Sequence, residues 1–347
     1  MDWSKIKMCN SELNDWFDFR QLIGKKVLVT GATGLIGVNL IKTLMRENEL
    51  LSEPIHIIAL VRNPDKAQKV FGDDYGNIRC ITGNIIDPIF IPGEIDYIVH
   101  TASQTSSKGF VEQPLATIST AINGTLNMLE LARKKEIKKF VYLSTMEVYG
   151  TPYTDEKIDE SHGTNIDTMS VRSSYPESKR MCENLCVSYM KEYGVPVNVI
   201  RLTQTFGPGV AYNDGRVFAE FARCVIEKKN IILHTNGETK RNYLYTQDAV
   251  NAILTVMIKG KNGQVYNAAN ESTYCSIYEM AQMVAKRCAK GEIDVKIEIA
   301  DTSNFGYAPT LRMNLDTSKL KSLGWKPKVG LEEMFNNLID DMRENAI

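Results

Sequence analysis

The sequence predicts an α/β fold: a doubly wound parallel sheet followed by a smaller C-terminal lobe. Short, nearly continuous apolar runs recur up to about residue 203, as in strands that are buried on both faces of a sheet. Longer segments with helical periodicity separate these runs. Beyond residue 203 the alternation loosens, which indicates that a different unit begins there.

The predicted sheet begins with a strand, a tight turn and a helix. Residues 27–30 are aliphatic and β-branched, and apolar residues then recur at helical spacing from Leu35 to Leu44. The following segments repeat this alternation of buried runs and amphipathic stretches. We predict further strands at 55–61, 78–82, 95–100, 139–143 and 196–201, and long helices near 111–136 and 174–193.

The C-terminal part has a looser pattern. Gly207, Pro208 and Gly209 interrupt the chain, and irregular stretches follow. The run at 264–270 predicts one more strand that returns to the sheet. This unit should lie at the carboxyl edge of the strands, where doubly wound sheets bind ligands. We predict helices here near 216–228, 247–258, 276–290 and 331–344.

Charge and composition exclude several classes of protein. The chain has 347 residues, a formal net charge of −1 and no apolar run near the roughly 20 residues that cross a bilayer. We therefore expect neither nucleic-acid nor membrane binding. The N-terminus has no apolar core of the signal-peptide type, which predicts a cytoplasmic protein. The seven cysteines include no Cys-x-x-Cys pair, and we expect no metal site.

A glycine-rich turn is the first motif that carries chemistry. It lies between the first strand and the first helix. Glycine lets the backbone turn sharply and approach a pyrophosphate, and the helix N-terminus adds free amides and a positive dipole. This context predicts a Rossmann-type dinucleotide site. The predicted contacts in the turn are Gly31, Thr33, Gly34, Leu35, Ile36 and Gly37.

The dinucleotide motif suggests how the chain divides. An N-terminal extension should cover residues 1–23. A dinucleotide-binding Rossmann domain should cover 24–203 and also receive about 242–270. A smaller substrate-binding lobe should then consist of 204–241 and 271–347.

The end of the second predicted strand bears on the choice of cofactor. An acidic residue there would hold the 2′-hydroxyl of the adenosine ribose, but the sequence has Val61, Arg62 and Asn63. An arginine at this point can accommodate a 2′-phosphate instead. Arg62 therefore favours NADP over NAD, unless it is only a solvated residue of a surface loop.

A tyrosine and a lysine provide the third pattern. Tyr175 and Lys179 lie four residues apart at the start of a predicted helix, so they face the same way. Lys179 could hold the nicotinamide ribose and lower the pKa of the Tyr175 phenol. A tyrosinate could then take a proton from a sugar hydroxyl as hydride leaves the carbon. Ser144 and Thr145 follow the predicted fifth strand and belong to the same pattern.

With these motifs in view, the sequence resembles the extended short-chain dehydrogenase/reductases, in their NAD-dependent epimerase/dehydratase branch. The resemblance extends from Val27 to Pro327. It includes the segment from Ser144 to Gly150, the segment from Arg201 to Gly209, and the segment from Gly237 to Asp248. The family implies a Rossmann domain, a small substrate domain and a nucleoside-diphosphate sugar as substrate.

The resemblance also implies roles for individual residues. Thr145, Tyr175 and Lys179 match the catalytic triad. The cofactor positions are Asn84 and Ile85 at the adenine, Ala102 and Ser103 at the nicotinamide, and Tyr175 and Lys179 themselves. The substrate positions are Gln204, Arg241 and Arg312. Either arginine could clamp the diphosphate with a bidentate guanidinium, or could be an ordinary ion-pair partner.

Two departures from the family pattern affect the expected reaction. The 4,6-dehydratases of the family have Asp and Glu after the threonine, whereas this chain has Met146 and Glu147. A thioether cannot donate a proton, so dehydration by that route is disfavoured. Glu147 resembles the glutamate of the nucleotide-sugar uronate decarboxylases, which carry serine where Met146 stands. Gln204 replaces the usual asparagine, and its extra methylene suggests an unusual substrate or pose.

The leading hypothesis is a redox-neutral nucleotide-sugar enzyme, an epimerase or decarboxylase that acts through a 4-keto intermediate with NADP or NAD. The first alternative is an NADPH-dependent reductase of a nucleotide-linked keto sugar, which Arg62, Met146 and Gln204 favour. A binding protein that senses dinucleotides without turnover is a third possibility, against which the intact Tyr175 and Lys179 argue. The long helices near 111–136 and 174–193 carry apolar residues on more than one face, which predicts a homodimer.

Overall fold

A seven-stranded parallel sheet forms the centre of the molecule, which is a computed structural model that describes residues 17–300 and 310–345. The strand order is β11-β7-β5-β4-β1-β2-β3, and every neighbouring pair is parallel. The chain order reverses on either side of β1, as in a doubly wound sheet. The strands are β1 (Lys26–Thr30), β2 (His56–Val61), β3 (Arg79–Thr82), β4 (Tyr97–His100), β5 (Lys139–Thr145), β7 (Val197–Leu202) and β11 (Val265–Ala268).

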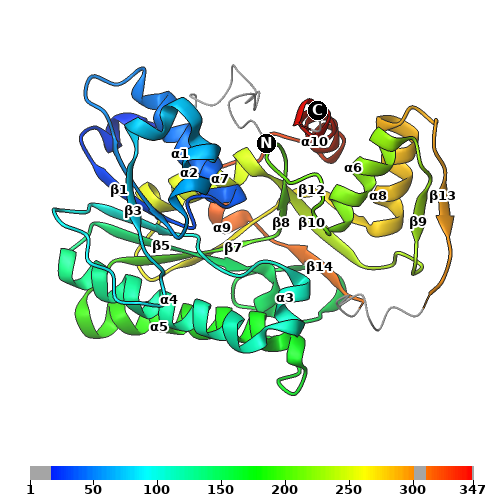
Figure 1. Cartoon of the computed structure of the whole chain (residues 1–347). Coiled ribbons are helices and arrows are strands. Elements are labelled where there is room, and N and C mark those ends of the chain that lie inside the picture. Colours follow the sequence, from blue (N-terminus) through cyan, green and yellow to red (C-terminus); the bar gives the residue numbers. More distant parts are fainter. Residues whose placement is uncertain (1–16, 301–309, 346–347) are drawn as a thin grey trace.

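Helices cover both faces of this sheet, so the predicted fold class is confirmed (Figure 1). One apolar cluster joins the sheet to the helices of the first face, and a second cluster joins it to those of the other. The first face carries α1 (Leu35–Asn48), α2 (Pro64–Phe71) and α7 (Thr246–Lys259). The other carries α4 (Pro114–Lys135) and α5 (Ser174–Tyr193), with the short α3 (Ser107–Glu112) before them.

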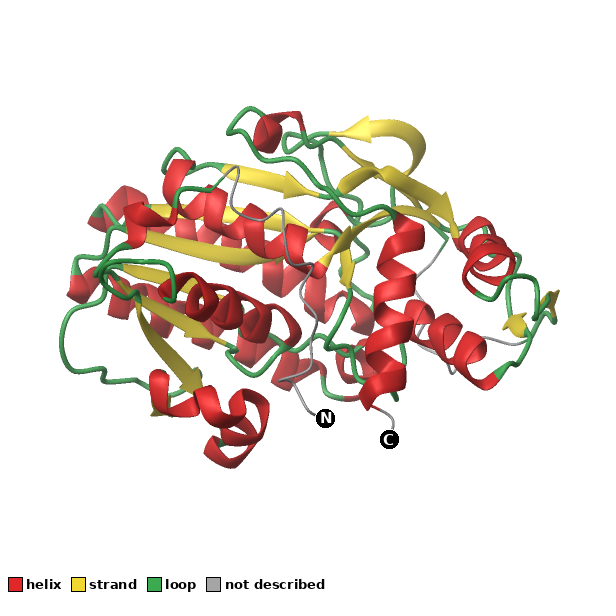
Figure 2. Ribbon diagram, turned by 90° about the horizontal axis from the view of Figure 1, so that it is seen from above, coloured by secondary structure: helices red, strands yellow, loops and turns green. Residues whose placement is uncertain are grey.

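A second sheet lies beyond the carboxyl ends of these strands (Figures 1 and 2). Its order is β12-β10-β14-β6, with β8 also paired to β10, so β6 from the first part of the chain completes it. The strands are β6 (Tyr153–Ile158), β8 (Gln204–Phe206), β10 (Lys240–Tyr245), β12 (Asn270–Ser276) and β14 (Arg312–Leu315), with the separate pair β9 (Ile231–Leu233) and β13 (Val295–Ile297).

Most of the remaining α-helices pack around this second sheet. The apolar cluster of the lobe includes Phe206, whose ring contacts those of Phe218 and Phe335. The α-helices are α6 (Val217–Glu227), α8 (Ile277–Met283) and α10 (Leu331–Asn345), together with the short α9 (Ser318–Lys321), which packs against β11 of the large sheet. The 3-10 turns are η2 (Phe19–Leu22), η3 (Gly72–Asn77), η4 (Met146–Tyr149) and η5 (Val171–Ser173), and η6 (Val284–Cys288) is a π-helical turn.

Three predicted elements are divided in the structure. The helix expected near 111–136 is α3 and α4, and the break falls at Pro114, whose missing N–H fits the first turn of a new helix. The strand expected at 264–270 splits because β11 joins the large sheet while β12 pairs with β10. The helix expected near 276–290 changes to the π-helical η6. No helix in residues 17–300 or 310–345 is long and apolar enough to cross a bilayer.

Candidate active site

A cavity of about 1260 Å³ lies at the carboxyl ends of the large sheet, between that sheet and the second lobe. This is the position at which doubly wound sheets bind ligands. It brings together residues that are far apart in the sequence. The sequence-predicted site residues on its wall are Gly31, Thr33, Gly34, Leu35, Ile36, Arg62, Asn84, Ile85, Ala102, Ser103, Thr145, Glu147, Tyr175, Lys179, Gln204 and Arg241.

Two predicted site residues, Gly37 and Arg312, do not line the cavity. Gly37 faces the turn itself, because a Cβ added there would lie 2.3 Å from the Gly31 carbonyl oxygen. It therefore allows the helix to pack closely on the turn. Arg312 donates to Asp155 at 2.9 Å and lies over the Tyr153 ring, as an ordinary ion-pair partner would.

The glycine turn fits a dinucleotide pyrophosphate. Gly31 has a φ of 63°, and a Cβ there would meet the Ala102 nitrogen at 2.8 Å and the Thr101 hydroxyl at 2.6 Å. Gly34 is the N-cap of α1, with no side-chain hydrogen bond to the first turn of the helix. The backbone thus leaves room, and the first amides of α1 can meet an anion.

The predicted adenosine end of the cavity carries positive charge. Arg62 and Lys66 both line it, and the Asn63 side chain accepts from the Lys66 amide at 2.9 Å to cap α2. Asn84 and Ile85 follow β3 on the same wall. The Ile85 carbonyl accepts from Asn127 at 2.8 Å, which attaches this loop to α4.

A buried histidine at the end of β4 was not recognised from the sequence. The Thr30 hydroxyl lies 2.7 Å from His100 Nδ1 and accepts from the Ala102 amide at 3.2 Å. Burial, with the charge of Lys179, lowers the pKa of His100 to about 3, so the imidazole is neutral at physiological pH. These contacts join β1 to β4 where the sheet order reverses. A histidine that ends an apolar strand is the only signal that the sequence offered.

Tyr175 and Lys179 lie together in the first turns of α5, beside the end of β5. The Lys179 ammonium donates to the Leu143 carbonyl at 2.6 Å and lies 5.9 Å from the centre of the Tyr175 ring. Burial lowers the pKa of Lys179 to about 8. Burial, and secondarily the Glu147 carboxylate, raise the pKa of the Tyr175 phenol. A hydrogen bond with Thr145 acts in the opposite direction, but burial outweighs it.

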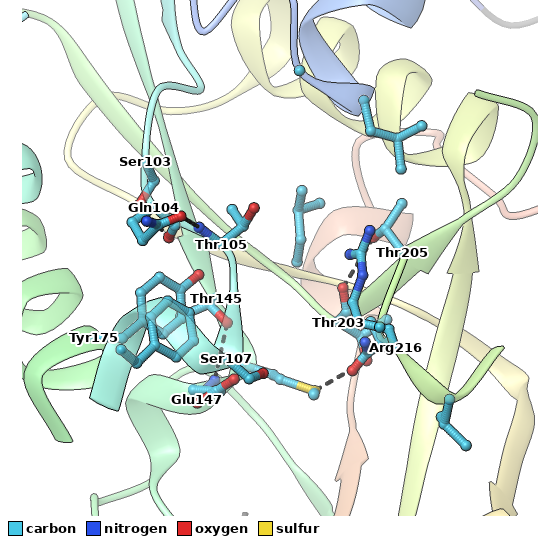
Figure 3. Close-up of a pocket in the computed structure, with 18 of the residues that line it drawn as sticks. Ser103, Gln104, Thr105, Ser107, Thr145, Glu147, Tyr175, Thr203, Thr205 and Arg216 are labelled. Carbon is cyan, nitrogen blue, oxygen red and sulfur yellow. Dashed lines mark hydrogen bonds between the residues drawn. The ribbon is translucent and has the colours of Figure 1, made fainter. Parts of the chain in front are cut away.

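Aromatic and polar groups around Tyr175 include several that sequence reasoning missed. The Phe110 ring stacks on the Tyr175 ring with centroids 4.2 Å apart, and the Phe110 carbonyl accepts from Ser174. Phe110 belongs to α3, which no motif marked. Figure 3 shows Tyr175, Thr145 and Glu147 on one side of the cavity and Arg216, Thr203 and Thr205 across from them.

The segment after Thr145 places an apolar and a charged side chain next to each other. Met146 is buried, and its sulfur accepts from the Thr203 hydroxyl at 3.2 Å. Glu147 forms an ion pair with Arg172, at 2.9 Å between Oε2 and Nη1. Sequence reasoning gave Arg172 no role.

The second lobe contributes two further arginines to the cavity wall. Arg241 donates to Gln204 at 3.1 Å, and its Nε is buried with no hydrogen-bond partner in the described part of the chain. Arg216 forms a fork with Asp214, with 2.7 Å between Nη2 and Oδ2. Both guanidinium groups suit a diphosphate. The described residues contain no group of three or more His, Cys, Asp or Glu arranged to hold a metal ion.

Comparisons with known proteins agree with this geometry. A family model described as NAD dependent epimerase/dehydratase family matches residues 27–269. UDP-glucuronic acid decarboxylase 1 of Xenopus tropicalis is 32% identical over 92% of this chain and 72% of its own. UDP-glucuronic acid decarboxylase 6 of Arabidopsis thaliana is 31% identical over 92% of this chain and 89% of its own.

Solved structures share the fold. The UDP-glucose 4-epimerase of Thermotoga maritima superposes with a TM-score of 0.78 at 24% identity, over 93% of this chain and 100% of its own. The UDP-glucuronic acid 4-epimerase of Bacillus cereus, solved with NAD, has a TM-score of 0.76 at 22% identity, over 93% of this chain and 100% of its own.

Proposed function

The chain belongs to the NAD dependent epimerase/dehydratase family, and from that membership we propose that it acts on a UDP-linked uronate, with decarboxylation as the leading reaction. The chain is an enzyme that modifies a nucleotide sugar through transient oxidation at C4 with NAD. Net reduction of a keto sugar is the less favoured alternative. The observation that carries the proposal is that Tyr175, Lys179 and Glu147 share one cavity with the glycine turn.

In this proposal each residue acts at a stated atom. The Tyr175 phenol takes the proton of the C4 hydroxyl and later returns it, and Thr145 orients that hydroxyl. Lys179, close to the Tyr175 ring, favours the phenolate. The cofactor supplies the means of removing a hydride from C4 and restoring it. A ketone at C4 lets the C5–C6 bond break, so that C6 leaves as CO₂ and the electron pair forms an enolate over C4 and C5. C5 then takes up a proton from solvent, which Glu147 is placed to relay.

The reaction can be tested with purified protein, NAD and UDP-glucuronate. We expect a UDP-pentose and CO₂, detected by mass spectrometry, with no net change in NADH absorbance at completion. Product that forms only when NADPH is consumed would contradict the proposal and favour the reductase.

A second candidate reaction is 4-epimerisation of the same uronate. The observation that favours it is Met146, which is buried where the resembling decarboxylases carry serine. A thioether offers no proton donor beside Glu147. Epimerisation, in which the keto sugar rotates and is reduced again, needs no such donor at position 146. Chromatographic separation of UDP-glucuronate from its isobaric 4-epimer distinguishes this outcome from decarboxylation.

The preference between NADP and NAD is a finer proposal. Family membership supports NAD, and Arg62 and Lys66 on the cavity wall support affinity for the 2′-phosphate of NADP. We expect tighter binding of NADP than of NAD in titrations, with the difference narrowed in Arg62→Ala. Equal or tighter binding of NAD by the unmutated protein would contradict this preference.

We also propose a homodimer in which α4 and α5 pair with their copies. The two helices pack side by side on one face of the sheet (Figure 1). Their outer sides expose Leu115, Met181 and Val187, which would be covered in a four-helix arrangement. Light scattering at micromolar concentration should give the mass of a dimer, and a monomer would contradict the pairing.

Three earlier expectations are kept as part of the proposal. The domain division assigns residues 24–203, with about 242–270, to the dinucleotide, and 204–241 with 271–347 to the substrate. The extension over 1–23 lies mainly outside the described residues. A cytoplasmic location and the lack of a nucleic-acid partner rest on the sequence alone.

A further inference from the structure

The ion pair between Glu147 and Arg172 lies in the catalytic part of the cavity. Both side chains line the cavity and remain partly exposed, at 26% and 20% respectively. Glu147 comes from η4, directly after β5, and Arg172 comes from η5, three residues before Tyr175. The Arg172 guanidinium also lies 5.9 Å from the centre of the Phe110 ring, which stacks on Tyr175. Arg172 is therefore close to the position where C4 of the sugar must react.

The pair leaves part of the guanidinium unused. Glu147 engages Arg172 through Nη1, whereas Nε is buried and has no hydrogen-bond partner in residues 17–300 and 310–345. A buried N–H without a partner is unfavourable, and a carboxylate that met the guanidinium edge with two oxygens would remove that penalty. Arg172 can thus hold a carboxylate better than its present contact does.

Apart from Arg62 and Lys66 at the predicted adenosine end, the other arginine and lysine side chains of the cavity each contact a protein group. Arg216 forms a fork with Asp214, Arg241 contacts Gln204, and Lys179 donates to the Leu143 carbonyl. Arg216 and Arg241 belong to the second lobe, across from Tyr175, where the diphosphate is proposed to lie. Arg172, three residues before Tyr175 and beside the Phe110 ring that stacks on it, is therefore the cation from which we argue for a carboxylate at C6.

We propose that Arg172 is the specificity-determining residue that recognises the C6 carboxylate of a uronate, and that Glu147 occupies it in the substrate-free enzyme. The inference rests on the proposed function for its substrate class. Binding of the uronate exchanges one carboxylate for another on the same guanidinium, which releases Glu147 toward C5. A sugar with a neutral hydroxymethyl group at C6 leaves the Glu147–Arg172 pair in place.

The test compares three probes on the NAD-loaded protein by calorimetry: UDP, UDP-glucose and UDP-glucuronate. The two sugars differ only at C6. The unmutated enzyme should bind UDP-glucuronate more tightly than UDP-glucose. In Arg172→Gln this preference should disappear, with a loss of UDP-glucuronate affinity on the order of tenfold to a hundredfold and little change for UDP. Arg172→Lys should recover part of it, because the charge is kept and the fork is lost.

Glu147→Gln separates carboxylate exchange from a purely structural brace. If Glu147 competes with the substrate for Arg172, its neutralisation should tighten UDP-glucuronate binding severalfold even though turnover falls. A structural brace predicts weaker or unchanged binding. Arg180→Gln, on the exposed side of α5, is the matched control and should alter none of the three affinities.

The outcomes keep the two proposals apart. An unmutated enzyme that prefers UDP-glucuronate but forms no product contradicts the proposed reaction and leaves the role of Arg172 standing. An enzyme with no preference between the two sugars, or an Arg172→Gln variant that loses affinity for all three probes equally, overturns the role of Arg172. Thermal unfolding of each variant checks that the fold is intact.

Discussion

At the glycine turn the cavity wall is formed by backbone and small side chains, whereas the proposed sugar end includes charged side chains that are paired with one another. Gly31 and Ala102 approach each other at the ends of two adjacent strands, β1 and β4. Glu147 and Arg172, by contrast, come from separate turns joined by a long excursion of the chain. The proposed contacts to the pyrophosphate are therefore backbone groups at the strand ends, whereas the proposed contacts to the sugar are side chains.

The two ends of the cavity should therefore respond differently to substitution. Cofactor binding depends on space and backbone conformation, so added atoms should harm it most. The sugar end depends on the charge of individual groups, so isosteric changes of charge should matter there. Tyr175 and Lys179, which serve both ends, should show the largest effects.

Tyr175→Phe is expected to have the largest effect. Loss of the phenol oxygen should lower kcat by about 10²–10⁴-fold, the usual range for general acid–base catalysis, with the affinities for NAD and UDP-glucuronate nearly unchanged. Steady-state kinetics and calorimetry measure the two parts. Full activity of the variant would show that Tyr175 is not the group that takes and returns the proton.

Lys179→Met should stabilise the protein while it removes activity. The pKa of the buried Lys179 falls from 10.5 to about 8, so the folded state loses its proton before the unfolded state does. Stability should therefore rise as the pH increases from about 8 to 10.5 in the unmutated protein, and at pH 7 the full penalty applies. Removing the charge should add at most roughly 3.5 kcal/mol, since each pKa unit corresponds to about 1.4 kcal/mol.

Denaturant unfolding at pH 7 and pH 10 measures this difference. The variant should lose the rise in stability between the two pH values. Lys191→Met, an exposed position on the same helix, is the control and should change neither value. A variant that is less stable at pH 7 would mean that the Lys179–Leu143 hydrogen bond outweighs desolvation.

Gly31→Ala tests the cofactor end. The positive φ and the contact of a new Cβ with the Ala102 backbone should destabilise the turn by about 1–3 kcal/mol and weaken NAD binding by tenfold or more. Gly34→Ala is the matched control, because its Cβ would lie 3.2 Å from a single backbone oxygen. Equal losses of NAD affinity in both variants would contradict the importance of backbone conformation at Gly31.

Gln204→Asn should have the smallest effect, at the sugar end. The shorter side chain should lose its 3.1 Å contact with Arg241 and leave that guanidinium free to meet the diphosphate. We expect UDP affinity to change by no more than severalfold, since a single hydrogen bond contributes about 0.5–1.5 kcal/mol. A change confined to the sugar, with UDP affinity constant, would place Gln204 beside the sugar rather than the phosphates.

The local order of the chain was sufficient to predict the cofactor end. Strand, glycine turn and helix are consecutive, and a buried parallel strand can end only at the carboxyl edge of the sheet, so Gly31, Arg62 and Asn84 had to reach the same edge. The pairing of Tyr175 with Lys179 was likewise predictable, because residues four apart on a helix lie on the same face. These inferences need only secondary structure and the handedness of its connections.

The tertiary structure alone decided which charges meet. Arg241 and Arg312 matched the family equally well, yet Arg241 reaches the cavity while Arg312 pairs with Asp155. Arg172 pairs with Glu147 across a long gap in the sequence, and burial in the sheet, with the charge of Lys179, lowers the pKa of His100. Periodicity predicts which face a residue occupies, but the partner of a charged side chain depends on side-chain packing between segments that the sequence places far apart.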